Sequence, residues 1–129
     1  MERRGLWLAC GWFLILLIIY LSLRPGGPVL PPSISDKLQH VAAYGVLTYW
    51  FACLYLRLSG RLACAVAFVL LGVGLEFIQA LTGYRSFDLI DMVADAAGVV
   101  LGWLAAPPRL PSLPIAFERW VQGAGYNRY

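Results

Sequence analysis

The residues that could do chemistry in this chain are few, and most of them are acidic. Among 129 residues there are seven acidic residues and a single histidine. Five of the acids and the histidine are candidates for proton transfer, ligand binding or metal ligation: Asp36, His40, Glu76, Asp88, Asp91 and Asp95. Their sequence neighbours include two cations, Lys37 and Arg85. Some carboxyl groups must therefore be protonated, bonded to one another or neutralised by a bound cation.

The spacing of these residues assigns them to faces of helices. Asp36, His40 and Tyr44 stand at i, i+4 and i+8, and Asp88, Asp91 and Asp95 stand at i, i+3 and i+7. Small and polar residues extend the pattern, with one stripe at Gly72, Glu76, Gln79 and Gly83 and a continuation of the aspartates at Gly98 and Gly102. Small residues let helices approach closely in a membrane bundle, so these stripes are predicted to meet inside it.

Composition indicates which elements must position these side chains. The chain is 60% hydrophobic and 13% charged, whereas soluble domains are about 45–50% apolar and about 25% charged. An ordinary soluble domain and a disordered chain are both excluded. The formal net charge of +3 includes no basic block beyond Arg3 and Arg4, so no nucleic-acid partner is expected.

Four apolar stretches predict an all-α fold, a polytopic integral membrane protein built as a four-transmembrane-helix bundle. Each stretch approaches the roughly 20 residues that cross a bilayer. We expect a single membrane domain over residues 1–129, with spans at about 5–23, 38–56, 62–81 and 88–106, an outer loop at 24–37 and a cytoplasmic tail at 107–129. Residues 115–121 of that tail are expected to form a short interfacial helix. Ser35 or Asp36 could cap the second helix, and Asp88 the fourth.

The arginines predict the orientation of the chain. Seven of them precede the first span, separate the second from the third, or follow the fourth: Arg3, Arg4, Arg57, Arg61, Arg109, Arg119 and Arg128. Because arginine accumulates on the cytoplasmic side of membrane proteins, both termini are predicted to be cytoplasmic, and the candidate acids lie at the outer face. The three cysteines, Cys10, Cys53 and Cys64, lack metal-ligand spacing and are expected to be small buried hydrophobes.

Three kinds of chemistry fit the acidic set. The first is general acid–base catalysis on an envelope lipid or saccharide, with four catalytic candidates: His40, Glu76, Asp91 and Asp95. The second is a metal site formed by the same four, but their spacing matches no recognised ligand pattern, so neither a metal nor a cofactor is expected. The third is a pocket for an amine-bearing headgroup or antibiotic, or a proton relay, with these binding candidates: Asp36, Lys37, His40, Tyr44, Glu76, Gln79, Arg85, Asp88, Asp91 and Asp95.

A structural role is the alternative for several of these residues. Asp36 and Asp88 could serve only as helix caps, with Arg85 as their counter-ion. Tyr44 and Gln79 could join paired acids in a network that fixes helix register. No nucleophile motif appears, and whether the protein is an enzyme is left open.

The same residues resemble the VanZ-like family of small bacterial membrane proteins. The matching elements are Asp-Lys-Leu-Gln-His at 36–40 followed by Tyr44 and Leu47, then Glu76 with Gln79, then Arg85 followed by Asp91, position 95, Gly98 and Gly102. They span residues 36–102, about half of the chain. The family is named for a member linked to low-level resistance to the glycopeptide antibiotic teicoplanin, and its domain has four or more membrane helices.

The resemblance implies a protein of the bacterial cytoplasmic membrane that binds or acts on a cell-envelope component and lowers susceptibility to glycopeptides such as teicoplanin. Its implied partners are membrane lipid and an envelope lipid, saccharide or glycopeptide. Asp95 departs from the family pattern, which usually has asparagine there, and this could alter the choice of ligand. Two alternatives stay open: a membrane enzyme acting on a lipid-linked substrate, and a structural partner subunit of a membrane complex.

Overall fold

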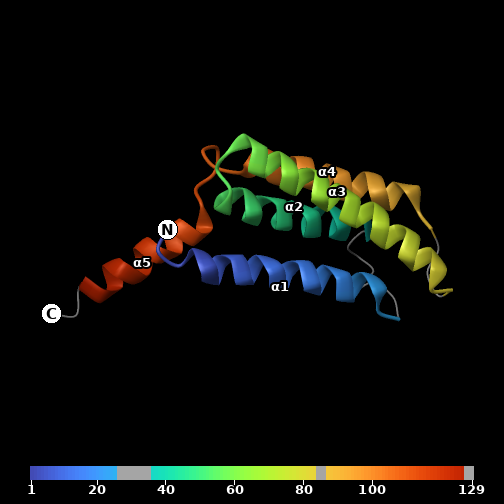
Figure 1. The fold of residues 1–129 in the computed structure, drawn as a ribbon, viewed down its shortest axis with the longest axis horizontal. Helices are drawn as coiled ribbons and strands as arrows, with labels where there is room; N and C mark the ends of the chain where they lie inside the picture. Colours follow the sequence, from blue (N-terminus) through green and yellow to red (C-terminus); the bar gives the residue numbers. More distant parts are fainter. Residues whose placement is uncertain (26–35, 84–86, 127–129) are drawn as a thin grey trace.

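The structure, a computed structural model, describes residues 1–25, 36–83 and 87–126. These residues contain five α-helices: α1 (Arg4–Leu23), α2 (Asp36–Leu54), α3 (Leu58–Leu81), α4 (Leu89–Ala105) and α5 (Leu113–Tyr126). Helices α1 to α4 run side by side, and α5 points away from one end of the bundle, beside the N-terminus (Figure 1). The prediction of an all-α fold is confirmed.

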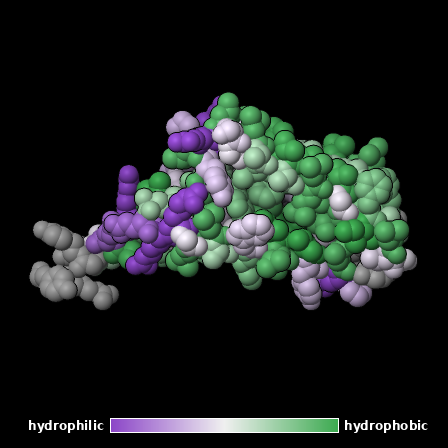
Figure 2. Space-filling view, viewed as in Figure 1, coloured by the Kyte–Doolittle hydropathy of each residue, from purple (hydrophilic) through white to green (hydrophobic). Residues whose placement is uncertain are grey.

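Two of the described helices, α1 and α3, are long and apolar enough to cross a membrane. The other helices do not meet the same measure of length and apolar composition, and a four-span bundle stays a prediction. Much of the surface in view is nonetheless hydrophobic (Figure 2). Apolar side chains such as Trp12 and Phe13 of α1 are exposed, whereas Glu76 and Asp95 are buried. This distribution is the reverse of that in a soluble helical bundle.

The observed helix ends differ from the predicted ones where a charged residue joins a helix. Helix α3 begins at Leu58, four residues before the predicted start at 62. Arg61 fits in its first turn because its guanidinium turns back and donates to the carbonyl oxygens of Tyr55 and Ala52, both at 3.0 Å. These are the last carbonyl groups of α2 and its connection, where a cation is favourable. Helix α5 extends beyond both ends of the predicted 115–121 segment.

The closest helix contact joins α2 to α4 through glycine. A Cβ atom on Gly98 would lie 2.5 Å from the carbonyl oxygen of Val41 and 3.1 Å from the nitrogen of Gly45. Gly102 packs in the same way against the Gly45 carbonyl one turn further along. The predicted stripe of small residues on α4 is therefore confirmed as a helix contact, and it meets a glycine on α2 that the prediction did not include. The buried cluster of Tyr44, Leu47, Phe51, Phe68 and Val99 continues this contact into the core.

On α3, the predicted glycine stripe is only partly right. Gly72 is buried against α4, where a Cβ atom would lie 2.7 Å from Oδ2 of Asp95. Gly83, in contrast, is exposed beyond the end of α3 and has φ of 79°. Glycine adopts this left-handed conformation readily and is the usual residue just past a helix end. Gly83 thus terminates α3 and does not share a face with Glu76.

Glu118 attaches α5 to the beginning of α1. Its carboxylate accepts hydrogen bonds from the indole Nε1–H of Trp7 at 2.6 Å and from the backbone N–H groups of Arg3 and Glu2 at 3.0 and 3.1 Å. The donation from Trp7 is the main reason why the pKa of Glu118 is lower than usual. This carboxylate satisfies N–H groups that have no partner within α1. Nothing in the sequence of the tail indicated the contact.

The three cysteines carry no disulfide bond. Cys53 is buried, as predicted, whereas Cys10 and Cys64 are only half-buried.

We predict that Gly98→Ala lowers the free energy of unfolding by about 1–3 kcal/mol, because the added methyl group overlaps backbone atoms of α2. Gly74→Ala is the matched control, because nothing lies within 4 Å of a Cβ atom at Gly74. Alanine there should raise stability by up to about 1 kcal/mol. Thermal unfolding in a single detergent measures both. A Gly98→Ala protein as stable as Gly74→Ala would contradict the contact.

We predict that the stability contributed by Glu118 depends on pH. Its pKa in the folded state is below the ordinary value of about 4.3, so the contribution is complete above that value and disappears as pH falls through the lowered pKa. Glu118→Gln should therefore reduce the unfolding temperature at pH 7, and its difference from wild type should shrink below about pH 4. Glu2→Gln is the control and should show little effect at either pH. A difference that is constant with pH would count against this role.

Candidate functional site

The candidate site forms where the first turns of α2 and α4 meet the last part of α3. Asp88 caps α4, with its Oδ1 accepting from the backbone nitrogen of Ile90 at 2.9 Å, as predicted. The backbone N–H of Asp88 in turn donates to Oε1 of Glu76 at 2.6 Å. Glu76 is almost fully buried. Its observed contact is thus with the backbone at the start of α4, which holds α3 and α4 in register.

Lys37 connects the first turn of α2 to that of α4. Its ammonium group donates to Oδ2 of Asp88 at 2.5 Å and also to Oδ1 of Asp91. Oδ2 of Asp36 lies 3.8 Å from the same nitrogen. The Lys37 side chain is 36% exposed, whereas that of Asp91 is 11% exposed. The lysine therefore supplies the positive charge for a largely buried aspartate.

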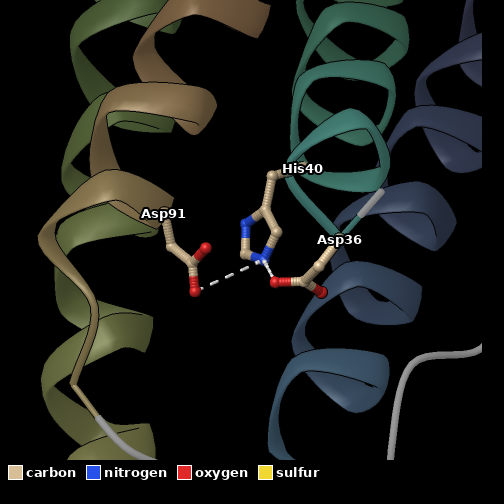
Figure 3. A group of neighbouring side chains, drawn as sticks. All are labelled: Asp36, His40 and Asp91. Carbon is tan, nitrogen blue, oxygen red and sulfur yellow. Dashed lines mark ion pairs between the residues drawn. The ribbon is translucent and has the colours of Figure 1, made fainter. Parts of the chain in front are cut away.

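His40 lies between the aspartates of two helices (Figure 3). Its Nδ1 is 2.6 Å from Oδ1 of Asp95, a side chain that is only 4% exposed. On the other side of the ring, Nε2 is 3.9 Å from Asp36 and 3.8 Å from Asp91. With Asp95 ionised, Nδ1 carries the proton of the short hydrogen bond, and Nε2 is directed at the two remaining carboxylates. The ring is held in one orientation with its second nitrogen toward the more open side.

Two other predicted binding residues, Tyr44 and Gln79, lie outside the group formed by His40, Lys37 and the aspartates. Tyr44 is buried one turn deeper than His40 and packs on Gly98. The amide nitrogen of Gln79 donates to the carbonyl oxygen of Ser22 at 2.6 Å, so Gln79 joins α3 to α1 and lies apart from the His40 group. Arg85 lies outside the described residues.

A cation could be held by a smaller set than the predicted one. Ligand atoms of Asp36, His40 and Asp91 all lie within 4.8 Å of one another. The predicted set contained Glu76 and Asp95 in place of Asp36, but Glu76 accepts from the Asp88 backbone and Asp95 from His40. Two carboxylates and an imidazole suit an ammonium group or a divalent metal ion. Lys37 already contributes one ammonium group beside them.

The central position of Lys37 was not predicted, although it was among the binding candidates. Lys37 and His40 stand three residues apart on one helix, which places them on the same face. That spacing was the available signal. Which aspartates they contact depends on the packing of α2 on α4.

We predict that Lys37→Met reduces the free energy of unfolding by about 1–3 kcal/mol, because the largely buried Asp91 carboxylate loses its charged donor. Lys37→Arg keeps the positive charge and should restore most of the stability. Chemical or thermal unfolding of the purified variants provides the measurement. Equal stability of the methionine and arginine variants would show that the ion pairs do not support the fold.

Comparison with known proteins gives one informative similarity. The chain is 40% identical over 97 residues to the uncharacterized protein C11E3.10 of Schizosaccharomyces pombe. The matched region is 71% of this chain and 58% of the yeast protein, so the chain spans less than two thirds of that relative. No family model matches the sequence. No solved structure matches it. The chain is therefore similar to a eukaryotic protein that itself has no assigned activity.

Proposed function

We propose that the chain is an integral membrane protein with four spans, α1 to α4, whose acidic site binds the positively charged headgroup of a cell-envelope component. The site comprises Asp36, Lys37, His40, Asp91 and Asp95. The length and apolar character of α1 and α3 support the membrane placement. Helices α2 and α4 contain 19 and 17 residues, or about 25–29 Å at 1.5 Å per residue, close to the thickness of a hydrocarbon core. Their charged residues face each other, which is the arrangement that charges require in lipid.

One observation carries the proposal. The carboxylates of Asp36 and Asp91 flank Nε2 of His40, and the ammonium group of Lys37 contacts those of Asp88 and Asp91. Among the described residues at this end of the bundle, five acids (Asp36, Glu76, Asp88, Asp91 and Asp95) accompany two cations, Lys37 and Arg24 at the end of α1. With His40 neutral the sum is 2 − 5 = −3. Such an excess of negative charge in an apolar bundle favours a cation. The ammonium group of Lys37 already binds carboxylates of this site in the way proposed for the charged headgroup of the ligand.

The orientation in this proposal follows the arginines. Both termini lie in the cytoplasm, and the acidic site opens on the outer face of a bacterial cytoplasmic membrane. The VanZ-like resemblance extends the proposal to lowered susceptibility to glycopeptides such as teicoplanin. Asp95 is central to the difference from that family, because an asparagine could accept the Nδ1–H bond of His40 but would carry no charge. An aspartate at this position adds a negative charge beside His40.

A membrane enzyme acting on a lipid-linked envelope substrate is the second candidate. The 2.6 Å contact between His40 and Asp95 favours it. A buried carboxylate that orients an imidazole through Nδ1 leaves Nε2 able to accept or donate a proton. Asp36 and Asp91 lie beside Nε2 and could exchange that proton with it.

We predict that the purified protein in lipid nanodiscs binds dodecylammonium about tenfold more tightly than dodecanol, which has the same chain and no charge. Asp36→Asn and Asp91→Asn should each reduce this preference about tenfold, the effect of about 1.4 kcal/mol. Calorimetric titration at pH 7 measures the affinities. Glu2→Gln is the matched acid-to-amide control at the other end of the molecule and should behave like wild type.

The same variants, together with His40→Gln and Asp95→Asn, are then compared for teicoplanin sensitivity and envelope-lipid composition in a susceptible bacterial host. Loss of tolerance with unchanged lipids is expected for a binding protein. A change in envelope lipids that requires His40 would favour the enzyme instead. Variants that all express and match wild type in both assays would exclude a functional site here.

A further inference from the structure

The end of the molecule opposite the acidic site is rich in arginine. Six arginines lie at the start of α1, before and within the first turn of α3, and after α4: Arg3, Arg4, Arg57, Arg61, Arg109 and Arg119. Arg4 donates from Nη2 to the carbonyl oxygen of Leu54 at 3.3 Å, which joins the start of α1 to the end of α2. Hydrophilic residues gather at this end in the surface view (Figure 2). Against Glu2 and Glu118, the described charge is 6 − 2 = +4.

A groove of about 620 Å³ lies at this end between α1, α2 and α5, and Arg3 lines a neighbouring hollow that shares Phe117 with it. Its lining is apolar and strongly aromatic and includes Leu6, Trp7, Trp50, Leu113, Phe117 and Trp120. The ring of Trp7 lies edge-on to those of Trp50 and Phe117, with centroids 5.9 and 5.6 Å away. The indole N–H of Trp7 is bonded to Glu118, and that of Trp50 to the carbonyl oxygen of Trp7. The polar atoms of both rings are therefore satisfied within the protein.

Helix α5 presents two different faces. Glu118 is buried and bonded to the beginning of α1. Leu113, Phe117 and Trp120 stand at i, i+4 and i+7 on another face and are exposed, Trp120 to 69%. The Glu118 hydrogen bonds fix which face is turned outward. An aromatic stripe is thus held at the arginine-rich end of the molecule.

We propose that this groove, together with Arg3 and Arg119 at the same end of the bundle, binds an anionic phospholipid, with an acyl chain along the aromatic lining and the phosphate near these two arginines. Guanidinium groups pair with phosphate oxygens through two parallel hydrogen bonds. Tryptophan combines an apolar body with a polar edge and is enriched where acyl chains meet headgroups. The net positive charge selects an anionic headgroup over a zwitterionic one. This site rests on the proposed membrane placement and is independent of the ligand of the acidic site.

The test uses the full chain reconstituted into phosphatidylcholine vesicles. A fixed fraction of the lipid carries brominated acyl chains, attached either to phosphatidylglycerol or to phosphatidylcholine. Bromine quenches tryptophan fluorescence on contact, so the ratio of the two quenching curves gives the relative affinity for the anionic lipid. We expect a preference of about fivefold or more for phosphatidylglycerol, the effect of one arginine near a membrane surface. Trp120→Phe should remove much of the selective quenching.

Arginine variants locate the headgroup. Arg3→Gln and Arg119→Gln should each lower the preference severalfold, and the double variant should bring it close to one. Arg24→Gln, at the opposite end of α1, is the matched control and should leave the preference unchanged. A preference that survives the double variant would overturn the proposed site.

The remaining outcomes separate this proposal from the membrane placement. A protein that fails to co-float with the vesicles overturns both together. A protein that co-floats but is quenched equally by the two brominated lipids overturns the lipid site alone. That second result is the one expected if a protein partner covers the groove instead.

Discussion

Carboxylates placed inside an apolar bundle must each find a donor, and the arrangement of the helices follows from that requirement. A charged group that is buried there without a partner lowers stability by roughly several kcal/mol. Asp95 is paired with His40, Asp91 with Lys37, and Glu76 with the backbone of Asp88. Each of these contacts joins two different helices. The polar groups that are most costly to bury are therefore the ones that set the register of α2, α3 and α4.

Glycine makes these short contacts geometrically possible. Side chains as short as aspartate reach a neighbouring helix only where the two backbones are close. Gly98 and Gly102 bring α4 against the backbone of α2, and Gly72 leaves room for Asp95 beside α3. A bulkier residue at any of these positions would separate the acids from His40 and Lys37. The small residues and the charged residues of the three helices thus form a single structural unit.

The two ends of the molecule carry charge excesses of opposite sign. At one end, acids outnumber cations, and an internal lysine ammonium group and an imidazole occupy the space between them. At the other end, arginines outnumber acids, and Glu118 is bound by three N–H donors. The proposed ligands follow from these excesses: a positively charged headgroup at the acidic end and an anionic phospholipid at the basic end. The bundle between them presents many exposed apolar side chains.

Sequence patterns were sufficient for the elements of this fold. Apolar runs predicted the helices that the structure describes as α1 to α4, and the position of Asp88 before an apolar run predicted its cap. The expected up-and-down order of the helices predicted that the acids of α2, α3 and α4 gather at one end. In that order the starts of α2 and α4 lie beside the end of α3. The predictions for α3 were wrong at its two ends, where single residues determine how the helix begins and stops. Arg61 is inside α3 because it binds carbonyl groups of the preceding residues, and Gly83 terminates α3 through its positive φ.

What the sequence by itself determined is the composition of each helix face and the end of the bundle at which each polar residue lies. Only the tertiary structure decided the partners: Lys37 with Asp88 and Asp91, His40 with Asp95, Gln79 with the Ser22 carbonyl, and Glu118 with the first turn of α1. The physical reason is that helical periodicity fixes the relative direction of side chains within one helix. The rotation, depth and separation of two helices depend on how all of their contacting side chains pack, and a hydrogen bond of 2.6 Å depends on all three.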